Sequence, residues 1–243
     1  MLYSAKYNFI FIKSVKTAST SVEGALEFLI RNQAANHSTN SVLYADGSRI
    51  GYRGGNPSSD PNFGQASFSL NHMSAAKIRS LVGESSFYSA LKISSIRQPY
   101  DRCISAFHHL GKYSLEDIEA RKRYGDTALI KRDFHDFMST NTYDGAEHFY
   151  CDRKMIIDRF IRQEFLKEDL RAVLDMLSVG ADIAAYILGD IPIFKMTGRK
   201  YSFMRSIDYY DDASLSIVNK RFSNWFALGG YKMAHSLEDL ENL

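Results

Sequence analysis

Two short apolar stretches, each followed by a polar turn and then by a helical pattern, limit most strongly how this chain can fold. They are NFIFI at residues 8–12 and ALKISSI at residues 90–96. A largely apolar run of this length is typical of a parallel strand that is covered on both faces. After each turn, apolar residues recur at helical spacing, over about 20–31 and 100–110. Strands that alternate with helices predict an α/β fold with a central, mostly parallel sheet flanked by helices.

The length and charge of the chain set further limits. With 243 residues it suits one domain over 1–243, or at most two small ones, and we expect one. Hydrophobic residues make up 45% and charged residues 24%, as in an ordinary soluble globular protein. A formal net charge of +2 argues against a nucleic-acid partner held by bulk electrostatics, and it leaves room for a local basic cleft.

The cysteines and the apolar runs indicate the cellular compartment in which we expect the protein. Cys103 and Cys151 match no metal-binding spacing, and although one disulfide between them is open, a reduced compartment is the simpler expectation. No apolar run approaches the roughly 18 residues of a membrane span. No basic stretch followed by an apolar one opens the sequence, so we expect no secretory signal and a cytoplasmic protein.

The remaining pattern completes the expected order of elements. Residues 44–66 are rich in Gly, Ser, Asn and Pro, which predicts a flexible loop or a loose hairpin. Further strands are expected at 66–72, 155–162 and 192–196, and further helices at 74–83 (with Ser74 as N-cap and Gly83 as stop), at 114–140 (broken near Gly125), at 167–178 and at 211–226. Ligands of parallel sheets bind at the carboxyl ends of strands, where Lys16, His72 and Arg97 are expected.

A lysine and several hydroxylated residues stand where the first strand turns into its helix, in KTASTS at 16–21. A helix N-terminus presents unpaired N–H groups and a partial positive charge, which suit a phosphate or sulfate. Lys16 adds a mobile charge, Ala18 lets the backbone close around an anion, and hydroxyl donors come from Thr17, Ser19, Thr20 and Ser21. The nucleoside-triphosphate loop G-x-x-x-x-G-K-[ST] does not fit. A plain capped helix start with a surface lysine is the alternative.

A second polar motif, RQPYDRCIS at 97–105, follows the second strand. Arg97 stands at the strand exit, Pro99 suits the first turn of the next helix, and Ser105 lies eight residues after the arginine. An arginine gives planar, charge-assisted bonds to a phosphate, and a serine hydroxyl adds one more. Two anion sites on neighbouring strand ends suit a nucleotide with phosphates at both ends of its ribose.

Together the two motifs resemble those of the sulfotransferases that use 3′-phosphoadenosine 5′-phosphosulfate (PAPS). KSVKTASTS resembles the family's 5′-phosphosulfate loop P-K-[ST]-G-[ST]-T, and IRQPYDRCISAF resembles its 3′-phosphate motif R-[ND]-P-x-x-R-x-x-S. The segments NHMSAAKIRSLVG, DRFIRQE and DYYDD…GGY are similar to the branch of carbohydrate and small bacterial sulfotransferases, so the likeness runs from about residue 7 to 231. The resemblance implies a nucleotide-kinase-like sulfotransferase fold.

The sequence departs from the family pattern at several positions. Val15 replaces the usual proline, Ala18 the usual glycine, and Gln98 the usual Asn or Asp; all three are small or isosteric enough to keep the geometry. The R-K-G triplet of some cytosolic members is missing, and Gly198-Arg199-Lys200 is the candidate substitute, with an ordinary basic loop as the alternative.

The resemblance implies sulfuryl transfer from PAPS as cosubstrate, without a metal. Such a transfer requires in-line positioning and charge stabilisation. Lys16 would neutralise charge on the bridging oxygen as 3′-phosphoadenosine 5′-phosphate (PAP) leaves. The loop N–H groups and hydroxyls of residues 17–21 would hold the 5′-phosphate, and Arg97 and Ser105 would hold the 3′-phosphate, with Arg199 and Lys200 as further nucleotide contacts.

An acceptor hydroxyl needs a general base, and His72 is the expected one because histidine titrates near neutral pH. The resemblance supports this choice, since several carbohydrate sulfotransferases carry a histidine between the two motifs. The alternative is a structural histidine ahead of the helix at Ser74. His108 and His109 are rival bases, whereas Glu23 is expected to stabilise a helix N-terminus.

The acceptor is expected to be a carbohydrate or another hydroxylated metabolite. Arg49 and Arg53 in the loop 44–66 suit an anionic sugar, with solvated loop arginines as the alternative. The basic residues between 111 and 150 are interspersed with acidic ones, as on a solvated helix face. A nucleotide kinase or a non-catalytic PAP-binding module are the rival functions; the first lacks its glycine–lysine order here, and the second would have no need of Lys16.

Overall fold

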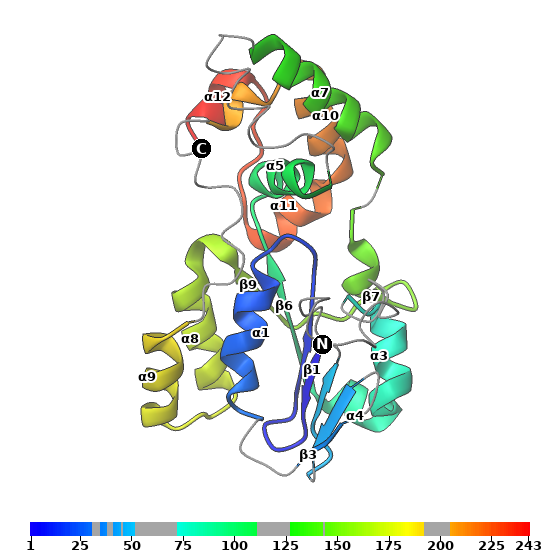
Figure 1. Cartoon of the computed structure of the whole chain (residues 1–243), viewed down its shortest axis with the longest axis vertical. Helices are drawn as coiled ribbons and strands as arrows, with labels where there is room; N and C mark the ends of the chain where they lie inside the picture. Colours follow the sequence, from blue (N-terminus) through cyan, green and yellow to red (C-terminus); the bar gives the residue numbers. More distant parts are fainter. Residues whose placement is uncertain are drawn as a thin grey trace. The chain divides into compact units, whose positions relative to one another are not determined.

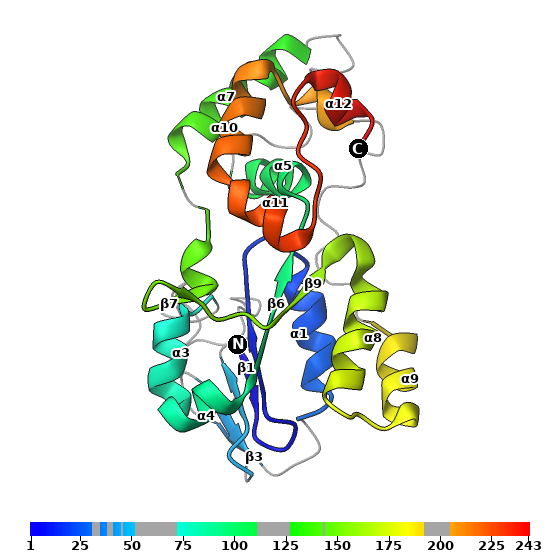
Figure 2. The ribbon, with the colours of Figure 1, turned by 180° about the vertical axis from the view of Figure 1, so that it is seen from behind.

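The chain forms two compact units, Met1–Ile96 with Gly145–Phe194, and Arg97–Asp144 with Lys195–Leu243. The second unit begins at the residue after the strand predicted at 90–96, and the expectation of a single domain stays a prediction. The computed structural model (Figures 1 and 2) describes residues 1–30, 35–37, 41–44, 46–51, 72–110, 127–142, 144–191 and 205–243. The strands predicted at 66–72 and 192–196 lie outside these residues, except for His72.

A mixed sheet organises the first unit. Its described strands are hydrogen-bonded in the order β3-β4-β5-β1-β2-β6-β9. The centre is parallel, because β2 pairs with β6 and β6 pairs with β9 in the same direction. The other described pairs are antiparallel and widen the sheet on the β2 side. The strand bounds are β1 Leu2–Ser4, β2 Phe9–Ile12, β3 Ala35–His37, β4 Ser41–Tyr44, β5 Arg49–Gly51, β6 Leu91–Ile96 and β9 Arg159–Arg162.

Helices cover both faces of the sheet centre, as the views from opposite sides in Figures 1 and 2 show. On one face, Phe9 and Phe11 of β2 pack in a core with apolar residues of α1, α8 and α9. On the other face, Ile10 and Ile12 pack with residues of α3 and α4. The alternation of side chains along β2 therefore fills two cores, which explains why the strand is apolar throughout. These helices are α1 Ser19–Glu27, α3 Ala75–Val82, α4 Glu84–Ser89, α8 Leu166–Met176 and α9 Ala181–Gly189.

The α/β class and its parallel centre are confirmed, with several shifts in bounds. The helix after the first strand ends at Glu27, four residues before its predicted end. The predicted strand 155–162 is two strands, because β8 (Lys154–Met155) closes a hairpin with β7 (Tyr150–Cys151) before β9 begins. Residues 44–66 were expected to form a flexible loop or a loose hairpin; β5 lies within this range and pairs with β4, which begins before it at Ser41, and residues 52–66 lie outside the described part.

The second unit is helical in its described part and has an aromatic core. It contains α5 Pro99–Leu110, α7 Thr127–Thr140, α10 Asp212–Arg221, α11 Ser223–Gly229 and α12 Leu237–Glu241. Tyr100 of α5 packs edge-on against Tyr210 at 5.6 Å between ring centroids, and its hydroxyl accepts the backbone N–H of Ala234 at 2.8 Å. The helix predicted at 211–226 is two helices, divided at Phe222, which is buried in this core.

The structure describes both cysteines and the lengths of the helices. Cys103 and Cys151 are both buried free thiols, and burial raises the pKa of Cys103 to about 12. Cys103 therefore packs as a small apolar side chain. Among the described residues, no helix is long and apolar enough to cross a membrane.

Candidate functional site

The Lys16 loop, residues 13–18, joins the carboxyl end of β2 to the start of α1. The predicted strand, turn and helix are thus confirmed. Lys16 (φ 63°) and Ala18 (φ 56°) both have the left-handed backbone conformation. Ala18 is the N-cap of α1, and its carbonyl accepts the N–H groups of Ser21 and Val22. Within α1, the first turn carries neither an acidic residue nor a side-chain cap, so the positive end of the helix is not neutralised from within it.

The hydroxyls of this loop divide into inward and outward sets. Thr17 is fully buried, and its hydroxyl lies 2.7 Å from those of Ser14 and Ser95. Ser19 is buried as well, and its hydroxyl donates to the Ser14 carbonyl at 2.7 Å. Ser21 is also buried. Lys16, Ala18 and Thr20 are half-buried, so they form the accessible rim of the loop.

A buried ion pair lies beneath the loop. The Nζ of Lys13 is 2.8 Å from a carboxylate oxygen of Glu23, and both side chains are almost wholly buried. The other oxygen of Glu23 is 3.4 Å from the α-amino group of Met1. Glu23 was predicted to stabilise the helix N-terminus. In the structure its carboxylate pairs directly with these two cations. The pair ties the first residue after β2 to the second turn of α1.

His72 lies beside the first residue of the Lys16 loop. Its Nδ1 is 3.1 Å from the backbone carbonyl of Lys13. Because a carbonyl only accepts, Nδ1 carries the proton in the neutral ring, and Nε2 carries the lone pair that a general base needs. Ser74, two residues later, accepts the N–H of Lys77 and caps α3 as predicted. The alternative role for His72, as a residue ahead of this cap, is therefore compatible with the same geometry.

A second histidine accompanies His72. The buried ring of His148 is 6.2 Å from that of His72, and its Nδ1 is 3.2 Å from the Met73 carbonyl. Burial is the main cause that lowers the pKa of His72 from 6.5 to about 4; the hydrogen bond to the Lys13 carbonyl opposes it, and the nearby charge of Lys13 adds to it. His72 is therefore neutral at physiological pH. Sequence reasoning missed His148, because the two histidines are far apart along the chain and nothing in the sequence indicates their contact.

Arg97 and Ser105, the second predicted anion motif, belong to the second unit. Arg97 follows the last residue of β6, and its side chain is 12% exposed. One guanidinium nitrogen is 3.3 Å from Asp101, one turn along α5, whereas the buried Nε has no hydrogen-bond partner among the described residues. Ser105 is half-buried on α5. The unmatched Nε is an observation that fits an anion ligand, because a buried donor without a partner is costly.

Two neighbours in this motif have clear structural roles. Gln98 precedes α5, and its side-chain oxygen accepts the Tyr100 N–H at 2.6 Å, so it does the capping for which Asn and Asp are preferred. Arg102, which sequence reasoning left without a role, is buried with its guanidinium 4.3 Å from the Trp225 ring centre. It holds α5 against α11 through a cation–π contact.

The rival base His108 is bonded to Tyr209 at 2.7 Å, and His109 is exposed.

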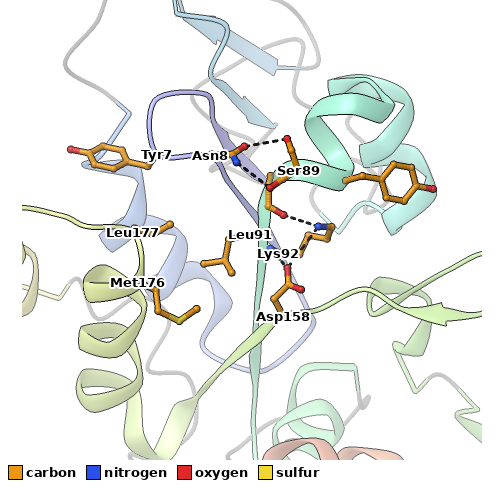
Figure 3. Close-up of a pocket in the computed structure, with 10 residues that line it drawn as sticks. Tyr7, Asn8, Ser89, Leu91, Lys92, Asp158, Met176 and Leu177 are labelled. Carbon is orange, nitrogen blue, oxygen red and sulfur yellow. Dashed lines mark hydrogen bonds and ion pairs between the residues drawn. The ribbon is translucent and has the colours of Figure 1, made fainter.

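The cavity in Figure 3 belongs to a different part of the first unit. It measures about 430 Å³ and is lined by residues at the amino ends of the parallel strands, among them Asn8, Leu91 and Asp158. The Lys16 loop is at the carboxyl end of β2. Asn8 bonds the Ser89 carbonyl, and Asp158 accepts the Lys92 N–H, so these groups serve the strand starts.

Several predicted positions lie outside the described residues, namely Arg53, Arg199 and Lys200 and the basic residues between 111 and 126. Of the loop arginines, Arg49 is in β5. Within the described part of the chain, no group of three or more His, Cys, Asp or Glu side chains is arranged to hold a metal ion.

Comparison with known proteins bears on the same segments. A search of curated proteins and a search of solved structures found no match. The family model described as "Sulfotransferase family" matches residues 1–183, which include the Lys16 loop, His72, Arg97 and Ser105. This match covers most of the 243 residues. The chain therefore belongs to the sulfotransferase family.

Proposed function

We propose that this chain transfers a sulfuryl group from PAPS to a hydroxyl group of an acceptor. The observation that carries the proposal is the Lys16 loop, which brings a lysine to a helix start whose first turn has neither a side-chain cap nor an acidic residue, in a chain of this family. Such a helix start suits an anion because its N–H groups and its dipole both favour negative charge.

The Lys16 loop would bind the 5′-phosphosulfate. Backbone N–H groups at the start of α1 and the hydroxyl of Thr20, a residue of the accessible rim, would hold the phosphate. Lys16 would neutralise the charge that builds on the bridging oxygen as PAP departs. Thr17 and Ser19 would contribute through their backbone, because their hydroxyls are already bonded inside the protein.

Arg97 and Ser105 would bind the 3′-phosphate and so favour PAPS over ATP. The support is the eight-residue interval of the motif and the buried Nε of Arg97, which lacks a partner in the described part of the chain. A phosphate oxygen would satisfy that donor with a charge-assisted bond. Arg199 and Lys200 are proposed as further nucleotide contacts on the basis of sequence alone.

His72 would act as the general base. The acceptor oxygen attacks sulfur while its proton passes to the Nε2 lone pair of His72. The bond between sulfur and the bridging oxygen breaks, and PAP leaves with that electron pair. The supporting geometry is the Nδ1 contact with the Lys13 carbonyl, which sets the tautomer that leaves Nε2 basic. No metal takes part in this scheme.

The acceptor is proposed to be a carbohydrate or another hydroxylated metabolite. The support is the resemblance of the sequence to the carbohydrate branch of the family. A non-catalytic module that only binds PAP is the main alternative, and a nucleotide kinase is a weaker one. A binding module has no use for a leaving-group lysine, so the behaviour of Lys16 variants separates the first alternative from an enzyme.

The test is an acceptor screen with ³⁵S-labelled PAPS, using the wild type, Lys16→Ala and Lys77→Ala. Lys77 is an exposed lysine on α3 and serves as the matched control. We expect transfer by the wild type and by Lys77→Ala, and loss of transfer in Lys16→Ala with PAP affinity only modestly reduced. Transfer by Lys16→Ala at the wild-type rate would remove Lys16 from the proposed mechanism.

A further inference from the structure

The Lys16 loop holds an unfavourable backbone conformation that something must enforce. Lys16 and Ala18 are both left-handed, although neither is glycine. Each such residue costs about 1–2 kcal/mol, so a conformation of this kind persists only where the surroundings fix it. The contacts that fix this loop therefore decide how well its N–H groups are arranged for an anion.

Among the described residues, Ser95 of β6 contacts the hydroxyls of the loop from a neighbouring strand. The hydroxyl of Ser14 donates to the Ser95 carbonyl at 2.5 Å, and the hydroxyls of Thr17 and Ser95 are 2.7 Å apart. The hydroxyls of Ser14 and Thr17 are also 2.7 Å apart. All three residues are 0% exposed, so this cluster is sealed from solvent and from any ligand.

Counting protons gives these hydrogen bonds a direction. Each hydroxyl has one proton to donate. Ser14 uses its proton on the Ser95 carbonyl, so Thr17 must be the donor to Ser14. Thr17 has then used its own proton, so Ser95 must be the donor to Thr17. The three bonds form a directed ring that starts at the Ser95 hydroxyl and ends at the Ser95 carbonyl.

We propose that Ser95 is a positioning residue for anion binding, acting through this ring of Ser95, Thr17 and Ser14. The ring fixes both flanks of left-handed Lys16, since Ser14 lies two residues before it and Thr17 directly follows it. It also leaves the Thr17 hydroxyl without a proton for a phosphate. The inference rests on the proposed function, because PAP is the anion used to measure it.

The neighbouring serine provides a matched control. Ser94 is also 0% exposed, and its hydroxyl donates to the carbonyl of Ile12, the last residue of β2, at 2.7 Å. Ser94→Ala therefore removes a buried hydroxyl from the same strand without touching the ring. Both alanine variants lose a buried hydrogen bond, so we expect similar losses of stability.

The experiment measures the Kd for PAP by calorimetry, together with the free energy of unfolding, in six proteins: wild type, Ser95→Ala, Thr17→Val, Thr17→Ser, Ser94→Ala and the double variant Ser95→Ala/Thr17→Val. We expect Ser95→Ala and Thr17→Val each to raise Kd about ten-fold, as when the competent loop conformation falls to about a tenth of the population. Thr17→Ser keeps the ring hydroxyl and should bind PAP more tightly than Thr17→Val, and Ser94→Ala stays within about two-fold of the wild-type Kd. The double variant Ser95→Ala/Thr17→Val should be no weaker than either single variant, because both break one ring.

Two results would overturn the proposal. A raised Kd in Thr17→Val with a normal Kd in Ser95→Ala would mean that Thr17 contacts the anion itself. Equal Kd values for PAP in Ser95→Ala and Ser94→Ala would mean that the Ser95 hydroxyl contributes to stability and not to anion binding. If the wild type does not bind PAP, the proposed function fails. The ring is then tested by hydrogen exchange. The ring predicts that the amides of residues 16–20 exchange faster in Ser95→Ala than in Ser94→Ala. Equal exchange in those two variants would reject the ring.

Discussion

At the scale of single residues, His72 combines a fixed tautomer with a depressed pKa. The Lys13 carbonyl takes the Nδ1 proton, and burial keeps the ring neutral down to about pH 4. A base must be neutral to accept a proton, so His72 is competent over the whole neutral range. Its low pKa also makes it a weak base, because the best general bases have pKa values near the working pH.

The pH dependence of the reaction should carry this signature. The value of kcat/KM reports the free enzyme. We expect the titration of His72 to leave kcat/KM unchanged from pH 6 to 8 and to lower it toward pH 4. His72→Asn keeps a hydrogen-bonding side chain but does not take up the proton, so it should lose about 10²-fold in rate, the lower end of the usual range. The measurement is a pH–rate profile of both proteins with an identified acceptor. Near-normal rates in folded His72→Asn would move the role of base to another residue.

Acid stability should report the same half-buried ring. The unfolded chain takes up the His72 proton near pH 6.5, whereas the folded chain takes it up near pH 4. The unfolded state therefore binds more protons between these values, and stability falls as pH falls through this window, by up to about 3 kcal/mol. Urea unfolding of the wild type and of His72→Gln at pH 7, 5.5 and 4.5 checks this. Equal losses in both proteins would show that other groups cause the acid sensitivity.

Some site residues follow from the sequence, and others do not. Lys16 and Arg97 follow from it because each is adjacent in the chain to the strand that positions it. Ser95 does not, because its contact with Ser14 joins residues 81 apart in the chain, across two neighbouring strands. The contact of the Thr17 hydroxyl with Ser95 was hidden for the same reason. Residue type predicts that a hydroxyl donates, but only packing decides which partner it finds.

At the scale of elements, the turn between β2 and α1 depends on the backbone of Ala18. Family members usually carry glycine at this place, and the left-handed φ of 56° gives the physical reason. Alanine adopts it with strain that glycine avoids, and a β-branched side chain adopts it with greater strain.

Substitution at Ala18 should therefore change stability in opposite directions. We expect Ala18→Gly to raise the free energy of unfolding by about 0.5–1 kcal/mol, the relief of strain less the added freedom of glycine in the unfolded chain. Ala18→Val should lower it by at least about 1 kcal/mol. Urea unfolding of the three proteins gives the comparison. Equal stability of the glycine and valine variants would contradict a left-handed Ala18.

The elements with local signals were predicted well. The helix at 74–83 carries its cap and its stop in the sequence, and both are used at Ser74 and Gly83. The antiparallel strands were harder, because β1 is three residues long and its pairing with β2 and β5 is set by the sheet. The division between α10 and α11 at Phe222 was also missed, although Ser223 and Asn224, residue types that are common in turns, directly follow it.

At the scale of the whole molecule, the two anion motifs fall in different units. The Lys16 loop and His72 belong to the first unit, and Arg97 and Ser105 belong to the second. The chain crosses from one to the other at the exit of β6, between Ile96 and Arg97. Periodicity along the sequence shows strands and helices but not how they divide into compact units, so this division was not predicted.

In the proposed function, the protein binds a nucleotide through two phosphates, the 5′-phosphate at the Lys16 loop and the 3′-phosphate at Arg97. Isothermal titration of PAP and of AMP, which lacks the 3′-phosphate, tests this most directly in the wild type and in Arg97→Ala. We predict that the wild type binds PAP at least about ten-fold more tightly than AMP, a difference of about 1.4 kcal/mol. Arg97→Ala should remove most of that difference by weakening PAP alone. Equal affinities of the wild type for PAP and AMP, or an unchanged preference in Arg97→Ala, would contradict the account.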